Sequence, residues 1–132
     1  MHKVDLNEPL SGFQKHIGYE LVEWSEGFAK LLLPIGPHLL NREGIPHGGA
    51  LATILDTAMG FAGSYTGDAD RPHIVMTLNL SVNYLAKAQG ELLTTIANVT
   101  GGGHKTFFAT AHTSDSSGAT IATATGIFKR KI

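Results

Sequence analysis

One acidic residue, Asp56, lies in the middle of a long apolar segment and is the first candidate for chemistry. A lone carboxylate in apolar surroundings is costly unless it is paired, hydrogen-bonded or used in a reaction. In a structural interpretation, the hydroxyls of Thr53 or Thr57 or a partner's backbone satisfy it. In a catalytic interpretation, it attacks an acyl carbon or activates water in a largely dry pocket, where carboxylates with shifted pKa values are concentrated. The residue types alone leave both interpretations open.

The pair Gly48-Gly49, which precedes the apolar segment, is the second candidate. Glycines here either give flexibility and close backbone packing or expose the first N–H groups of a helix, which have no intrahelical partner and lie at its positive end. Such donors stabilise an acyl oxygen that gains charge in a tetrahedral intermediate. Gly48 and Asp56 are about 12 Å apart along one helix. If both act on one acyl carbon they must come from two copies, which predicts a dimer with shared sites.

Three other polar residues are weaker candidates. Asn41 could position an acyl oxygen or water, although a loop asparagine is more often a turn residue. His47 could donate a hydrogen bond to the site or be an ordinary satisfied polar side chain. Thr77 is expected on the polar face of a strand, where threonine is common.

A glycine-rich segment, Gly101-Gly102-Gly103-His104-Lys105-Thr106, lacks the spacing of a Walker phosphate loop and joins two expected strands. We interpret it as a hairpin turn whose His104 and Lys105 could meet a ligand phosphate at the sheet edge. The seven histidines form no HxH or HExxH grouping, so no metal site is expected.

The surrounding pattern predicts the elements that position these residues. The segment after Gly49 is apolar all round, which predicts a helix wrapped on most sides. A short helix over residues 8–17, packed by Leu10, Phe13 and Ile17, and two strands over residues 19–24 and 28–33 are expected before it. Four strands at hairpin spacing are expected after it, over residues 73–84, 91–100, 105–113 and 119–129. This order predicts an α+β fold with an antiparallel sheet curled around one helix.

The strand over residues 73–84 has the clearest period-two pattern. One face is predicted to carry Ile74, Met76, Leu78, Leu80, Val82 and Tyr84. The opposite face is predicted to carry Val75, Thr77, Asn79, Ser81 and Asn83.

The composition excludes several classes of protein. The 132 residues suit one domain, and the 42% hydrophobic and 16% charged content is typical of a globular protein. A net charge of -1, with Lys129-Arg130-Lys131 as the single basic run, gives no sign of nucleic-acid binding. The absence of cysteine excludes disulfides, thiolate metal sites and cysteine nucleophiles. No signal peptide or membrane-spanning run is evident, so a cytoplasmic location is expected.

Taken together, Asn41, Gly44, His47-Gly48-Gly49 and Asp56-Thr57-Ala58 resemble the signature of hotdog-fold acyl-CoA thioesterases of the phenylacetate-degradation (PaaI) type. The resemblance extends over the strand residues 79–85 and covers the chain from about Gly18 onward. It implies a single hotdog domain over residues 1–132, with a sheet of five to six strands around the long helix. It also implies dimers joined edge to edge, which often pair into tetramers.

The resemblance implies a role for each candidate. Asp56 would be the nucleophile or general base, and the Gly48 N–H of the facing subunit would polarise the thioester carbonyl. Asn41 and His47 would place the thioester and the water, and Thr77 would hold the lytic water. Further substrate contacts would come from Gly49, Met76, Gly103, His104 and Lys105. No cofactor is implied, because coenzyme A is part of the substrate.

The leading hypothesis is therefore hydrolysis of an acyl-CoA to the free acid and CoA. Two alternatives remain: a hydratase or dehydratase acting on acyl thioesters, and a non-catalytic acyl-CoA-binding protein. These motifs do not identify the acyl group or the biological pathway. They also do not distinguish a nucleophilic from a general-base mechanism.

Overall fold

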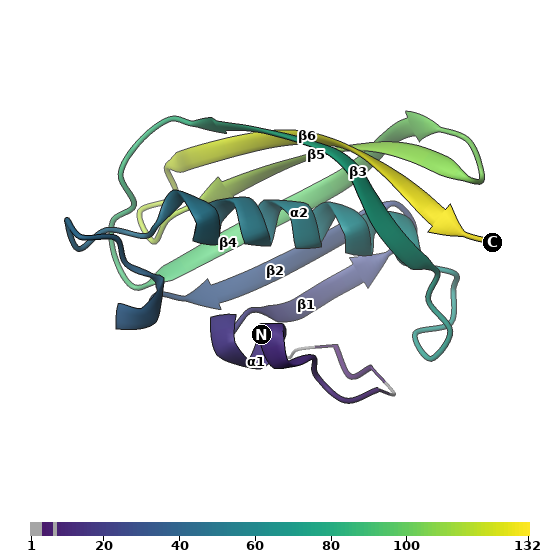
Figure 1. The fold of residues 1–132 in the computed structure, drawn as a ribbon, viewed down its shortest axis with the longest axis horizontal. Coiled ribbons are helices and arrows are strands. Elements are labelled where there is room, and N and C mark those ends of the chain that lie inside the picture. Colours follow the sequence, from purple (N-terminus) through teal and green to yellow (C-terminus); the bar gives the residue numbers. More distant parts are fainter. Residues whose placement is uncertain (1–3, 7) are drawn as a thin grey trace.

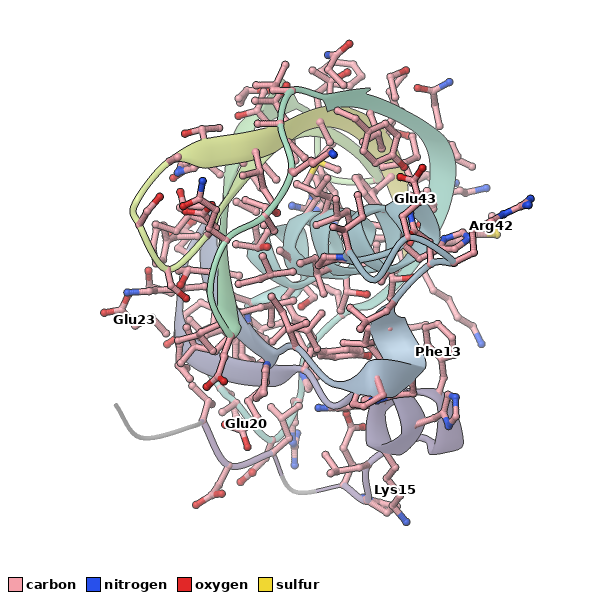
Figure 2. All side chains as sticks on the ribbon, turned by 90° about the vertical axis from the view of Figure 1, so that its left-hand side faces the viewer. Phe13, Lys15, Glu20, Glu23, Arg42 and Glu43 are labelled. Atoms are coloured by element: carbon pink, nitrogen blue, oxygen red, sulfur yellow. The ribbon has the colours of Figure 1, made fainter. Side chains whose placement is uncertain are left out.

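A six-stranded antiparallel sheet curves around one long helix in the computed structural model, which describes residues 4–6 and 8–132 (Figure 1). The strand order is β1-β2-β4-β5-β6-β3. Viewed along the long helix in Figure 2, the sheet wraps around the helix from one side. The predicted α+β architecture is confirmed, with six strands. The elements are α1 Gly12–Ile17, β1 Glu20–Ser25, β2 Phe28–Pro34, a 3-10 turn Pro37–Leu39, α2 Gly48–Ser64, β3 Ile74–Tyr84, β4 Leu92–Gly102, β5 Thr106–Ser114 and β6 Thr120–Lys131.

The long helix α2 packs its apolar side against the concave face of the sheet. Ile54, Leu55, Ala58 and Met59 are each at most 1% exposed. The side that carries Ala52, Thr53, Asp56 and Gly60 is only partly buried. The prediction that the helix is covered on most sides is therefore wrong for a single chain, because one curved sheet covers one side of a helix.

Small residues on the inner face of the sheet allow α2 to approach closely. Ala109, Ala111 and Ala124 are buried there. Next to them, the rings of Phe107 and Phe128 stack with centroids 5.2 Å apart. Close packing of this kind leaves little room for added volume.

A β-bulge interrupts β3 and changes which residues face the helix. Thr77 pairs with Phe128 of β6, whereas Asn79 pairs with the adjacent Ile127, so Leu78 is an extra residue. A bulge reverses the alternation of side chains beyond it. The inner face consequently carries Val75 and Thr77 before the bulge and Leu80, Val82 and Tyr84 after it.

The predicted single apolar face of β3 is therefore wrong. Ile74, Met76 and Leu78 are 66%, 57% and 51% exposed. Thr77, predicted on the polar outer face, points to α2 instead.

The connection after β3 also differs from prediction. The four strands after α2 do not form consecutive hairpins, because β3 pairs with β6 whereas β4 pairs with β2 and β5. The segment between β3 and β4 crosses the end of the sheet, where the Asp115 carboxylate accepts a hydrogen bond from the Gln89 N–H at 2.8 Å. The predicted strand ranges themselves agree with the structure to within two residues.

The first helix is shorter than predicted. It begins at Gly12, after Ser11, whose hydroxyl accepts a bond from the Gln14 N–H at 3.1 Å as an N-cap. Leu10 and Phe13 are 45% and 57% exposed, so their predicted packing role is wrong. In Figure 2, α1 lies at the margin of the molecule.

Candidate active site

Asp56 and Thr77 form a hydrogen-bonded pair between α2 and β3. The Thr77 hydroxyl donates to Asp56 Oδ1 at 2.7 Å. Thr53, one of the two hydroxyls predicted to satisfy Asp56, instead donates to the Gly49 carbonyl at 2.8 Å. The acid is partly exposed rather than buried. Among residues 4–6 and 8–132, Thr77 is the one hydrogen-bond donor to this carboxylate, which retains lone pairs for a reactant.

A hollow of about 290 Å³ begins at this pair and runs along α2. Its floor includes Gly60, one turn after Asp56 on the same side of the helix. A Cβ built at Gly60 meets nothing within 4 Å, so the missing side chain leaves open space. The remaining lining residues are Tyr19, Thr57, Phe61, Ser64, His73, Val75, Thr77 and Phe128.

Tyr19 contributes a phenol to this hollow that the sequence did not single out. The side chain is 8% exposed. Burial raises the pKa of Tyr19, the Thr57 hydroxyl partly opposes this rise, and the charge of Asp56 adds to it. The Tyr19 hydroxyl therefore stays protonated near neutral pH and can donate a hydrogen bond. Its residue type and its place at the start of an expected strand gave no signal of this position.

His47 caps the N-terminus of α2. Its backbone is extended, and its Nδ1 accepts a hydrogen bond from the Gly49 N–H at 2.8 Å. An Nδ1 that accepts a bond leaves the ring proton on Nε2, which can donate outward. The Gly49 N–H is thus occupied, while the Gly48 N–H has no partner among the residues that the structure describes. Gly48 is the better placed of the two glycines as an oxyanion donor.

Asn41 has the geometry of a turn residue. Its Oδ1 accepts bonds from the Glu43 N–H at 2.9 Å and the Ile45 N–H at 3.4 Å. The turn needs Gly44, whose φ of 78° lies in the left-handed region. Arg42 and Glu43 extend from it into solvent (Figure 2). Because the oxygen is occupied, only the amide N–H groups of Asn41 remain for a ligand.

Asn41 and Gly48 line a second hollow, separate from the first. It has a volume of about 380 Å³ and includes Tyr84 and Leu85 at the end of β3. None of its lining residues belongs to the hollow beside Asp56. A single chain therefore holds the acid and the free amide donor in different places, as expected from the rise of the helix.

The β4–β5 turn, which carries Gly103, His104 and Lys105, reaches the C-terminal end of α2. The His104 ring meets the His73 ring edge to face, with centroids 6.0 Å apart, and His73 lines the hollow beside Asp56. Arg130 holds this turn, since its guanidinium donates to the carbonyls of Gly103, His104 and Gly63 at 3.0, 2.8 and 2.7 Å.

Met76 lies elsewhere. It is 57% exposed on the outer side of β3 and does not line the hollow beside Asp56. Within the described part of the chain, no three metal-ligating side chains cluster. None of the helices in residues 4–6 and 8–132 is long and apolar enough to cross a membrane.

The chain belongs to the thioesterase superfamily, whose family model matches residues 43–122. The matched segment contains the Gly48-Gly49 pair, Asp56 and Thr77. A curated relative is the bovine (Bos taurus) acyl-coenzyme A thioesterase THEM4, which is 40% identical over 76 residues, or 55% of this chain. A Halobacterium salinarum relative is 34% identical over 85 residues, or 62% of this chain. The chain spans only 29% and 56% of the lengths of these two curated relatives.

Solved structures share the fold over most of the chain. A conserved protein of Pseudomonas aeruginosa, PA5202, has a TM-score of 0.83 at 28% identity, covering 92% of this chain and 95% of that one. The Escherichia coli PaaI protein has a TM-score of 0.80 at 22% identity, covering 92% of this chain and 86% of that one. The hotdog fold and the predicted resemblance to PaaI-type hotdog thioesterases are confirmed.

Proposed function

We propose that this protein is an acyl-CoA thioesterase that hydrolyses an acyl- or aryl-acyl-CoA to the free acid and CoA. The observation that carries the proposal is the Asp56–Thr77 pair at the mouth of a hollow, in a chain of the thioesterase superfamily. A thiolate is a good leaving group, so a carboxylate and an oxyanion donor suffice. The proposed reaction needs no cofactor, since coenzyme A belongs to the substrate.

In the proposed reaction the carboxylate of Asp56 either attacks the acyl carbon or removes a proton from water that attacks it. The acyl oxygen becomes negative and is stabilised by the Gly48 N–H, with Asn41 and His47 placing the thioester and water. The C–S bond then breaks, and CoA leaves as a thiolate that takes up a proton. On the general-base route this step yields the free acid directly. On the nucleophilic route it leaves an acyl–Asp56 anhydride, which water hydrolyses to the free acid and the Asp56 carboxylate. Thr77 orients Asp56 and holds the lytic water.

We propose a homodimer with shared active sites, and the separation of the two hollows supports it. The Gly48 N–H that serves one Asp56 would come from the facing subunit. The strand β3 supports this arrangement, because it lies at the sheet edge and pairs with β6 alone among the described strands. An unpaired strand edge is a template for pairing with another chain. We extend the proposal to pairing of dimers into a homotetramer.

The CoA nucleotide is proposed to lie near the β4–β5 turn. His104 and Lys105 are exposed there, and Lys129 and Lys131 of β6 are exposed on the strand next to it. Cationic side chains attract the phosphates of CoA. Met76 lies on the outer side of β3, so it would contact CoA only where CoA extends outside the hollow beside Asp56. A cytoplasmic location remains a prediction of the sequence.

Thiol release tests the function directly. A panel of acetyl-, medium-chain, branched and aryl-acyl-CoA substrates should give turnover with the wild-type chain. Asp56→Asn should lower kcat by roughly 10³-fold or more, as expected for a group that takes part in bond making. Asp70→Asn, which changes an exposed loop acid, is the matched control and should leave kcat unchanged.

Four results would contradict the proposal or a part of it. Near-native turnover by Asp56→Asn would remove the acid from the mechanism. Hydration of an enoyl-CoA without thiol release would favour the lyase alternative, and tight binding without hydrolysis would favour the non-catalytic one. A monomeric mass in solution at the assay concentration would exclude shared sites.

A further inference from the structure

The peptide group between Gly48 and Gly49 is held at both of its polar ends. Its carbonyl oxygen accepts a hydrogen bond from the Tyr84 hydroxyl at 2.8 Å. Its N–H donates to His47 Nδ1, also at 2.8 Å. Because the peptide group is planar, two bonds at opposite ends fix the orientation of the whole plane.

These two side chains add restraints to a part of the chain where the helix supplies few of its own. Two consecutive glycines have more backbone freedom than any other pair of residues, and the first turn of a helix lacks half of its internal hydrogen bonds. The Gly48 N–H, one of these free donors, lies on the peptide group next to the restrained one and shares the Gly48 Cα with it. Fixing the Gly48-Gly49 plane therefore restricts the direction in which the Gly48 N–H points.

The ring of Tyr84 also disfavours a side chain at residue 48. A Cβ at Gly48 would lie 3.3 Å from Cζ of Tyr84 and 3.4 Å from its hydroxyl oxygen, tighter than ordinary contact. The phenol thus occupies the space that a side chain at this position would need. Tyr84 itself is 54% exposed, so its contact with Gly48 is not simply a consequence of burial.

We infer that Tyr84 and His47 are positioning residues that direct the Gly48 N–H toward the thioester oxygen. The inference rests on the proposed function, in which that N–H is the oxyanion donor. An oxyanion donor must lie within about 2.7–3.1 Å of the place where charge develops. A donor that swings through several directions meets that condition for only part of the time, which slows the chemical step more than substrate binding.

Tyr84→Phe tests the tyrosine, because it keeps the ring and removes only the hydroxyl. We expect kcat to fall by about tenfold, less than the 10²–10³-fold that follows complete loss of an oxyanion donor, and KM to change by less than twofold. Tyr65→Phe is the matched control: no hydrogen bond of the Tyr65 hydroxyl occurs among the described residues, and kcat should stay at the wild-type value.

A spectroscopic measurement separates positioning from a purely structural role. The panel's fastest substrate, labelled with ¹³C at the carbonyl, is bound to Asp56→Asn so that it is not consumed. Its carbonyl stretch should be lowered by the Gly48 N–H, and adding Tyr84→Phe should return the band toward its solution frequency. If Tyr84→Phe only lowered the stability of the fold, the carbonyl band of substrate bound to the folded protein would keep its frequency.

Two substitutions test the histidine. His47→Ala removes the acceptor of the Gly49 N–H and should lower kcat by about tenfold, while His47→Asn supplies a side-chain oxygen, which is a favoured helix N-cap, and should restore most of it. An asparagine variant as impaired as the alanine variant would overturn the positioning role of His47. Its contribution would then come from the Nε2–H alone, which the proposed function already places near the thioester and water.

The inference and the proposed function fail in different ways. If wild-type protein releases no thiol from any acyl-CoA, the proposed function falls, and the positioning role falls with it. If wild-type protein is active but Tyr84→Phe changes neither kcat nor the carbonyl band, only the positioning role of Tyr84 is overturned.

Discussion

Thr77 and Tyr84 lie seven residues apart on β3, yet both side chains contact α2. Residues separated by an odd number in a regular strand point to opposite faces. Because Leu78 is an extra residue, the alternation of side chains shifts by one position after it. The Thr77 hydroxyl therefore bonds to the Asp56 carboxylate, and the Tyr84 hydroxyl bonds to the Gly48 carbonyl. A single edge strand thereby orders both polar parts of the candidate site.

The hydroxyl of Thr77 should matter more for catalysis than for folding. Thr77→Val keeps the shape of the side chain and removes the bond to Asp56 Oδ1. A hydrogen bond to a charged group is worth about 1.5–3 kcal/mol, so we expect kcat to fall roughly 10- to 100-fold. Thiol-release kinetics would measure this.

Thr77→Ser is the control, because it retains the hydroxyl and should keep most of the activity. Wild-type kcat in the valine variant would mean that the 2.7 Å bond is not used in the reaction.

The sequence predicted the fold well because its evidence is local and repeated. Each helix, strand or turn is indicated by its own local pattern: an apolar run, a period-two alternation or a glycine-rich segment. The spacing of residues from Asn41 to Asp56 adds the family resemblance. The bulge at Leu78 could not be predicted in the same way. The alternation of Leu78 and Leu80 is compatible with a regular strand. The change of register at Leu78 becomes visible only in the pairing of Asn79 with Ile127.

The candidate site was predicted in part for a similar reason. Asp56, Gly48 and His47 stand out by type and position in one segment. Tyr19 precedes β1 and Tyr84 ends β3, both far from α2 in the sequence, and their contacts depend on how these segments fold onto α2. Patterns along the chain do not report such long-range contacts.

Gly60 should control which acyl groups fit beside Asp56. Because a Cβ at Gly60 enters open space, Gly60→Ala should not disturb the fold. Replacing a glycine within a helix by alanine stabilises it by about 0.5–1 kcal/mol. The added methyl group should lower kcat/KM for bulky acyl groups and leave acetyl-CoA less affected.

The measurements are a thermal melt and a substrate panel on the same preparation of Gly60→Ala. A raised melting temperature with unchanged selectivity would show that the acyl group does not occupy this hollow.

Gly63, only three residues further along α2, should respond in the opposite way. A Cβ there would collide with the ring of Phe107, which is 1% exposed and stacks on Phe128. Overpacking of a core costs about 1–3 kcal/mol or more, so Gly63→Ala should lower the melting temperature by roughly 10 °C. An unchanged melting temperature would mean that the Phe107 ring can move aside.

Asp115 should make the stability of the fold depend on pH. Hydrogen bonds from the Ser117 hydroxyl and the Gln89 N–H, with smaller contributions from the Ser117 and Ala119 N–H groups, lower the pKa of Asp115 below its ordinary value. A carboxyl whose pKa is depressed on folding adds stability above its unfolded pKa of about 3.9 and loses it as the pH falls through the folded pKa.

Asp115→Asn cannot ionise and presents an amide to donors that need an acceptor, so it should melt several degrees below wild type at pH 7. The difference should narrow once the pH falls below about 4, because the unfolded wild-type chain then takes up a proton that the folded carboxyl, with its lowered pKa, still resists. Thermal melts of both proteins from pH 3 to pH 7 would test this. A gap of constant size over that range would show that the Asn variant acts through packing of the β5–β6 turn rather than through the charge of Asp115.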